Sequence, residues 1–332
     1  MEQPIRRRRK PSKNEQPGPG PVMLIGGAED KLKKRVILTR FLSLSGGADS
    51  HIAVISTASS LGDAATEFYR ELFTQMGAGT VSGLRPVTRE EANQEALVEV
   101  IDQATGVFLT GGNQLRLASV VGGTRLGAAL LEAHQRGVVI AGTSAGASAV
   151  STHMVAFGAA GASPKHRMVQ ISAGLGLLKG VVVDQHFEQR TRLGRLLTVV
   201  AQSPALIGLG LDEDTAAIIH SDETLEVIGR GSVTVIDGSV AQTDSYQTSG
   251  HKPMMVSGVV LHSIPSGYLF DLKSRSLVPS VGVPSPREAQ MAEAARRQME
   301  RLARQIASER TASSHTENRK DKPSQSLPEA SE

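Results

Sequence analysis

The 332-residue sequence contains no cysteine and no tryptophan, and only 3% of its residues are aromatic. Without cysteine the chain can form no disulfide, no thiolate nucleophile and no cysteine-ligated metal site, which favours serine, threonine or carboxylate chemistry. The scarcity of aromatic rings leaves few platforms on which the bases of a single-stranded nucleic acid could stack. We therefore expect no nucleic-acid partner.

Long apolar runs are also missing, and none approaches the roughly 20 residues that span a membrane. Residues 6–10 form a basic cluster, but residues 11–21 are polar or rich in proline and glycine, unlike the apolar region of a signal peptide. Part of the small net charge of +3 lies in this cluster, which we interpret as a solvated arm. The sequence thus predicts a cytoplasmic protein with no membrane partner.

Short apolar runs and amphipathic segments alternate along the middle of the chain. The apolar runs predict buried strands at residues 22–25, 51–56, 107–110, 138–141, 181–183 and 206–211. Segments between them, such as residues 64–76 and 90–104, have the spacing of amphipathic helices. This order indicates an α/β fold with a doubly wound, mainly parallel sheet.

The pattern changes toward the C-terminus. Residues 215–269 contain short β-like segments separated by glycine, aspartate and serine, which predicts an antiparallel extension of the sheet. Residues 287–310 have apolar side chains at spacings of three or four, as in an amphipathic helix. We expect a disordered arm (1–21), a main domain (22–283), a C-terminal helix (284–310) and a disordered tail (311–332).

The sharpest motif is Gly142-Thr143-Ser144-Ala145-Gly146, which directly follows a predicted strand. It fits the G-x-S-x-G pattern of a nucleophile elbow, in which glycines leave the serine accessible on a sharp turn. Ser144 is therefore the predicted nucleophile. The N–H of Ala145 would stabilise the oxyanion, with a second donor from Gly111 or Gly112 after the strand at 107–110.

A serine nucleophile needs a base, and His186 follows the predicted strand at 181–183, at the same edge of the sheet. The base in turn needs an orienting carboxylate. Asp184, two residues before His186, and Glu213, after the strand at 206–211, are both candidates. Glu213 is favoured because a side chain from an adjacent strand can face the imidazole.

Three arginines, Arg190, Arg192 and Arg195, follow His186 where a helix is predicted to begin. The helix dipole disfavours positive charge at that end unless the charge is paired. Because guanidinium groups bind carboxylates through two hydrogen bonds, the cluster predicts an anionic substrate. The alternative is pairing inside the protein with Glu188, Asp184 or Asp212.

Two more loops, residues 26–30 and Asn113-Gln114, lie at the same predicted edge. Gly26-Gly27-Ala28 lacks the third glycine and the later acidic residue of a dinucleotide site, and the sequence has no P-loop lysine motif. We expect neither a cofactor nor a metal.

Taken together, residues 26–31, 108–114, 142–148, 184–197 and 209–216 resemble the cyanophycinases of serine peptidase family S51. The resemblance runs from about residue 22 to residue 283 and implies a flavodoxin-like fold, a homodimer and a cofactor-free enzyme. The implied activity is exo-cleavage of cyanophycin (multi-L-arginyl-poly-L-aspartate) into β-aspartyl-arginine dipeptides. The implied catalytic residues are Ser144, His186 and Glu213, with Gly112 and Ala145 at the oxyanion. The residues expected to bind the substrate are Asn113, Gln114, Asp184, Gln185, Arg190, Arg192 and Arg195.

The chain departs from the family pattern at residues 151–170, which contain no carboxylate, so no acidic role carries over there. Two other functions stay open. An α-aspartyl dipeptidase or another S51 relative would share the elbow and the histidine but act on small soluble peptides. A non-catalytic protein could instead use a hydrolase-like scaffold to bind the polymer.

Overall fold

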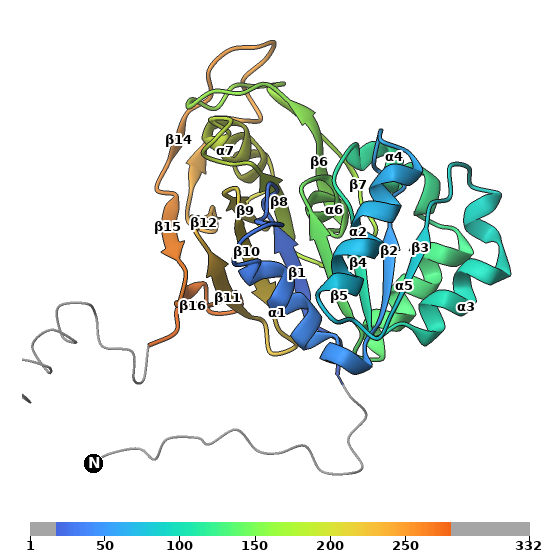
Figure 1. Cartoon of the computed structure of the whole chain (residues 1–332). Coiled ribbons are helices and arrows are strands. Elements are labelled where there is room, and N and C mark those ends of the chain that lie inside the picture. Colours follow the sequence, from blue (N-terminus) through green and yellow to red (C-terminus); the bar gives the residue numbers. More distant parts are fainter. Residues whose placement is uncertain (1–17, 280–332) are drawn as a thin grey trace, which may run out of the picture. The chain divides into compact units, whose positions relative to one another are not determined.

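The computed structural model describes residues 18–279, and five parallel strands form its centre (Figure 1). In spatial order they are β1 (Val22–Ile25), β5 (Val139–Thr143), β4 (Gly106–Leu109), β2 (His51–Ile55) and β3 (Thr80–Leu84). The carboxyl ends of these parallel strands lie at one edge, where the predicted loops meet.

Helices cover both faces of this sheet, which explains why β1, β4 and β5 are buried along their whole length. Met23 and Ile25 of β1 belong to one core cluster, with α1 (Val36–Leu44) and α2 (Asp63–Gln75). Val22 and Leu24 point to the other face and join a cluster with α3 (Glu95–Gln103), α4 (Gln114–Val121), α5 (Arg125–Gln135) and α6 (Ala145–Ala149). Successive side chains of a strand point to opposite faces, so burial on both sides requires an unbroken apolar run.

The predicted antiparallel extension begins on the other side of β1. β10 (Thr215–Ile219) runs antiparallel to β1, and β11 (Thr224–Gly229), β16 (Leu269–Asp271) and β17 (Ser276–Leu277) follow it outward. The nine-stranded sheet has the order β17-β16-β11-β10-β1-β5-β4-β2-β3. The predicted α/β class, with parallel strands and an antiparallel extension, is confirmed.

Two of the predicted strands belong to a different sheet. β8 (Val181–Gln185) and β9 (Ile207–Leu211) pair in parallel within a second, four-stranded sheet of order β15-β12-β9-β8, with β12 (Ser232–Asp237) and β15 (Val260–Pro265). Apolar runs alone do not say which strands pair. α7 (Leu193–Gln202) packs on this sheet, where a Cβ at Gly208 would lie 3.0 Å from side-chain atoms of Leu196 and Val200.

Helix α7 also begins later than the sequence suggested. Thr191 has a φ of 49°, in the left-handed region, so the chain turns there and Arg190 precedes the helix. The remaining strands are β6 (His153–Gly158), paired with β7 (Val169–Ala173), and β13 (Gln242–Thr243), paired with β14 (Val256–Ser257). Short 3-10 helices lie at η1 (Gly47–Asp49) and η2 (Glu91–Asn93), so the segment 90–104 contains η2 and α3.

The described chain up to Val278 forms one compact unit. Within it, no helix is long and apolar enough to cross a bilayer. The predicted C-terminal helix at 284–310, the tail at 311–332 and most of the arm at 1–21 lie outside the described residues, and the four domain boundaries stay predictions.

Candidate active site

Ser144 lies on a strained turn between β5 and α6. Its backbone has φ 51° and ψ −110°, a conformation that a non-glycine residue adopts only where its surroundings enforce it. The flanking glycines make the turn possible. A Cβ at Gly142 would lie 2.4 Å from the carbonyl carbon of Gly146, and a Cβ at Gly146 would lie 2.4 Å from the carbonyl oxygen of Leu109. The motif thus has the geometry of a nucleophile elbow.

Three side chains from different loops form a hydrogen-bonded chain at this turn. The Oγ of Ser144 is 2.9 Å from Nε2 of His186, and Nδ1 of His186 is 2.7 Å from Oε1 of Glu213. The Glu213 carboxylate accepts from Nδ1–H, so Nε2 is left as the acceptor for the serine proton. This is the arrangement of nucleophile, base and orienting acid that serine hydrolases use.

The end of β1 holds all three of these loops through its backbone. The N–H groups of Ser144 and His186 donate to the carbonyl oxygens of Ile25 and Gly26, each at 2.9 Å. The N–H of Asp214, next to Glu213, donates to the carbonyl oxygen of Gly27, also at 2.9 Å. Three consecutive carbonyl groups therefore fix the positions of Ser144, His186 and Glu213 relative to one another.

Glu29, for which the sequence indicated no role, lies two residues after Gly27. Its carboxylate is buried and accepts hydrogen bonds from Thr143 at 2.6 Å and from Tyr69 at 2.7 Å, and Nζ of Lys31 lies 2.9 Å away. Burial, and then the Glu29 charge, raise the pKa of the Tyr69 hydroxyl, which stays a donor. Since Thr143 precedes Ser144, Glu29 joins the loop after β1 to the elbow. The available signal was an acid two residues after a glycine pair that follows a strand.

Several groups shift the pKa of His186, and their effects oppose one another. Burial lowers it, the hydrogen bond and the charge of Glu213 raise it, and the charges of Arg190 and Arg192 lower it; the net direction is downward from the ordinary value. A lowered pKa keeps the imidazole neutral at neutral pH. His186 can then accept the serine proton.

Backbone N–H groups lie close to Ser144. The N–H of Ala145 opens α6, and Gly111 is so close that an added Cβ would lie 3.4 Å from the Cβ of Ser144. Gly112 has a φ of 140°, and a Cβ there would lie 2.0 Å from the carbonyl oxygen of Ala58, so only glycine fits. Among residues 18–279, the N–H groups of Ala145 and Gly112 have no acceptor. Both are thus available to an oxyanion.

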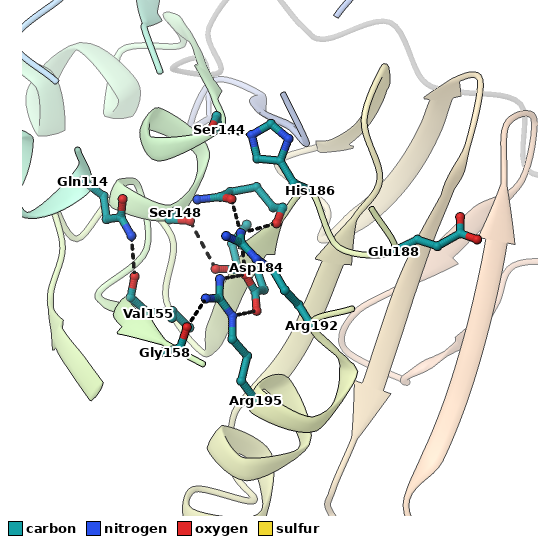
Figure 2. A network of polar contacts seen from close by, with 12 residues as sticks. Gln114, Ser144, Ser148, Val155, Gly158, Asp184, His186, Glu188, Arg192 and Arg195 are labelled. Carbon is teal, nitrogen blue, oxygen red and sulfur yellow. Dashed lines mark hydrogen bonds and ion pairs between the residues drawn. The ribbon is translucent and has the colours of Figure 1, made fainter. Parts of the chain in front are cut away.

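Asp184 and two of the three arginines form a buried network behind the histidine (Figure 2). Asp184 has no exposed surface, and its carboxylate accepts from Nε and Nη2 of Arg195 and from Nη1 of Arg192, the Nε contact being 2.6 Å long. Arg192 also donates to the carbonyl and side-chain oxygens of Gln185, and burial lowers its pKa to about 10. The arginines thus make the internal pairs that the sequence left open as an alternative. Their predicted contact with a substrate, and that of Asp184 and Gln185, stays a prediction.

The remaining predicted residues lie on either side of this network. Arg190 is exposed, and its side chain has no ion pair among the described residues. The side-chain oxygen of Asn113 caps α4 by accepting from the N–H of Arg116 at 3.1 Å. Gln114 donates to the carbonyl oxygens of Val155 and Ala156, at 3.0 and 2.8 Å. Of the predicted substrate contacts, Arg190 is therefore the cation left free to bind a carboxylate.

The described residues hold no group of three or more histidine, aspartate or glutamate side chains placed to bind a metal ion. The groups that converge at the elbow are Ser144, His186, Glu213 and the backbone donors. These groups together can form and hydrolyse an acyl-enzyme.

Comparison with known proteins gives the same family in sequence and a related fold in structure. The model of peptidase family S51 matches residues 22–228. Cyanophycinases of Synechococcus elongatus and of a Nostoc species are each 38% identical, over 78% of this chain and 81% and 88% of those proteins. The cyanophycinase of Geminocystis herdmanii is 36% identical, over 79% of this chain and 96% of that protein.

A peptidase from an acI-B1 actinobacterium has a similar fold, with a TM-score of 0.54 and 23% identity over 74% of this chain and 97% of that one. The family match spans the five parallel strands, the elbow and the loops that carry His186 and Glu213. The chain belongs to peptidase family S51.

Proposed function

We propose that the protein is a serine exopeptidase that hydrolyses cyanophycin and releases β-aspartyl-arginine dipeptides. The observation that carries this proposal is the continuous chain Ser144–His186–Glu213, with contacts of 2.9 and 2.7 Å. The names of the curated relatives support the choice of substrate, because the relatives cover most of the chain at 36–38% identity.

In the proposed reaction the three side chains act as nucleophile, base and orienting acid. The Oγ of Ser144 attacks the carbonyl carbon of the scissile peptide bond while Nε2 of His186 takes its proton. The N–H groups of Ala145 and Gly112 stabilise the negative charge on the carbonyl oxygen. His186 then gives its proton to the leaving amine, and an ester on Ser144 remains. Water, activated by the same imidazole, hydrolyses this ester and restores the serine.

Substrate recognition is proposed to depend on Arg190. It is exposed on the turn after His186, close enough for its charge to lower the pKa of that histidine. Each unit of cyanophycin carries a carboxylate on its arginyl residue, which a guanidinium group can bind. Direct roles for Asp184, Gln185, Arg192 and Arg195 are proposed from the family resemblance, and in this structure these groups bind one another. Roles for Asn113 and Gln114 belong to the same proposal.

A homodimer and a cytoplasmic location are also proposed, from the resemblance and the sequence alone. Light scattering on the purified protein would give twice the 35.0 kDa chain mass for a dimer. Cell fractionation with an antibody to the protein would test its location.

The decisive assay incubates the enzyme with insoluble cyanophycin, with α-aspartyl dipeptides, and with short soluble β-aspartyl peptides. Release of β-aspartyl-arginine from the polymer, absent with Ser144→Ala, is expected. Turnover of the dipeptides alone would favour the aspartyl dipeptidase alternative. Polymer binding without any hydrolysis would favour the non-catalytic one.

A further inference from the structure

A cavity of about 560 Å³ is lined by Phe187 and Glu188, which directly follow His186 in the chain, and is not used by the mechanism above. It lies between the turn after His186, the start of α7 and the second sheet. Its lining combines apolar side chains with hydroxyl groups and one exposed carboxylate: Phe187, Leu193, Leu261, Thr234, Ser263 and Glu188. Figure 2 shows Glu188 on the side of the turn away from Ser144, directed over the strands of the second sheet.

Glu188 is the charged residue of the cavity lining on which the inference depends. Its side chain is exposed and has no ion pair or hydrogen bond among the described residues. The other carboxylate in the lining, Asp212, is buried and already accepts from the N–H groups of Glu188 and Ser232 and from the Ser232 hydroxyl, at 3.0–3.2 Å. The lining arginine, Arg192, is bound to Asp184 and Gln185. Glu188 therefore has a negative charge without an internal counter-ion.

The lining suits one kind of side chain in particular. A guanidinium group on a flexible apolar stem needs a carboxylate for its charge and apolar surface for its methylene groups. Phe187, Leu193 and Leu261 supply the apolar surface, and Thr234 and Ser263 add hydroxyl acceptors. The negative charge of Glu188 would repel an anionic group in the cavity.

The turn itself has the charge pattern of the proposed substrate. Glu188 and Arg190 are two residues apart, both are exposed, and they have opposite charge. Each unit of multi-L-arginyl-poly-L-aspartate likewise has one guanidinium group and one carboxylate. The spacing also fits, because two residues span at most about 7.6 Å between Cα atoms, comparable with the length of an arginine side chain. By the same limit, the Cα of Glu188 lies within about 7.6 Å of the Cα of His186, in reach of a unit adjoining the scissile bond.

We propose that this cavity is a subsite for an arginyl side chain of the polymer, next to the unit being cleaved, and that Glu188 binds its guanidinium group. The inference rests on the proposed function and deepens it. In this proposal Glu188 recognises the positive charge of the substrate, and Arg190 recognises its carboxylate.

The test uses three-unit β-aspartyl-arginine peptides in which citrulline replaces arginine at one unit at a time. Citrulline has nearly the same shape but no charge, so each peptide removes a single guanidinium charge. With the wild-type chain, citrulline at the unit facing Glu188 should lower kcat/KM about tenfold or more, as expected for loss of a charge-assisted hydrogen bond. Glu188→Gln should no longer discriminate between arginine and citrulline at that unit. It should cleave the all-arginine peptide and this citrulline peptide at similar rates.

Two further variants complete the design. Leu261→Trp should obstruct the cavity from β15, where Leu261 is 51% exposed, and should reduce the same discrimination. Glu99→Gln removes a remote, exposed carboxylate on α3 and should discriminate like the wild type. If Glu188→Gln and wild type discriminate equally at every unit, the subsite proposal is overturned. If wild type cleaves none of the all-arginine peptides or the polymer, the proposed function fails instead.

Discussion

The imidazole of His186 lies directly against Gly27, where an added Cβ would be 2.4 Å from Cε1 and 2.6 Å from Nε2 of the ring. Gly27 also has a φ of 99°, which disfavours any side chain, and its carbonyl oxygen accepts from the N–H of Asp214. The absence of a side chain at this position therefore decides where the proposed base, His186, can lie.

Gly27→Ala should displace the imidazole from Ser144 and lower kcat by about 10²-fold, since a shift of about 1 Å in a reacting group has that effect. Gly47→Ala is a matched control, because Gly47 also has a positive φ, 63°, but no atom lies within 4 Å of an added Cβ. It reports the effect of backbone strain alone on the melting temperature and on kcat. Full activity in Gly27→Ala would mean that the ring is not held by this contact.

Ser144→Ala and His186→Ala should each lower turnover by several orders of magnitude, and the double variant should be little worse than either. The reason is that the two residues, with 2.9 Å between Oγ and Nε2, act as one unit. Single-turnover rates on the same substrate measure this. Losses that multiply in the double variant would show that the residues contribute independently.

Glu213→Gln should act mainly on kcat, by about 10³-fold or more, because glutamine cannot both accept from Nδ1–H and stabilise the imidazolium. KM should change little. Steady-state kinetics with circular dichroism as a folding check measure the effect. A variant that mainly raises KM would place Glu213 in substrate binding instead.

The acid limb of the kcat/KM profile should lie below pH 6.5, the ordinary pKa of histidine, because burial lowers the pKa of His186 and only the neutral ring can act as a base. The Arg190 charge also lowers this pKa. Arg190→Gln should therefore move the limb to higher pH, and lower kcat/KM about tenfold by removing a carboxylate contact.

Arg136→Gln, which removes a surface arginine paired with Asp102, serves as the control for this profile. Its acid limb should coincide with that of the wild type. A limb that stays in place in Arg190→Gln would mean that the arginine charge does not act on His186.

Asp184→Asn should destabilise the fold, because it leaves Arg192 and Arg195 buried without their counter-ion. Breaking such a buried pair costs about 3–5 kcal/mol, and the melting temperature should fall on the order of 10 °C. Asp102→Asn, in the exposed pair with Arg136, should change the stability by about 1 kcal/mol or less. If Asp184→Asn instead melts like the wild type and raises KM, Asp184 acts on the substrate.

Much of the site could be predicted because its residues follow apolar strands. Residues 22–25 form β1 with the predicted bounds, and the elbow, His186 and Glu213 each come after a strand that an apolar run marked. The carboxyl ends of parallel strands share an edge, so the sequence assigned these residues to one edge of one sheet. In the structure the elbow follows β5 in the nine-stranded sheet, whereas His186 and Glu213 follow β8 and β9 in the second sheet, and backbone hydrogen bonds to residues 25–27 hold the loops together. The preference for Glu213 over Asp184 as the partner of the imidazole rested on the ability of a side chain from an adjacent strand to face the ring, and the contact lies at Glu213.

The sequence by itself determined the α/β class, the elbow and the order of the loops, since these depend on hydrophobic periodicity and on glycines that a sharp turn requires. Tertiary structure alone decided which charges are buried together. The sequence shows Arg190, Arg192 and Arg195 as one cluster, yet the left-handed turn at Thr191 leaves Arg190 exposed while the other two pair with Asp184. Local composition contains no information on desolvation, which depends on the packing of α7 against the second sheet. The contact between Gly27 and His186 has the same origin, because it joins loops that only the assembled sheets bring together.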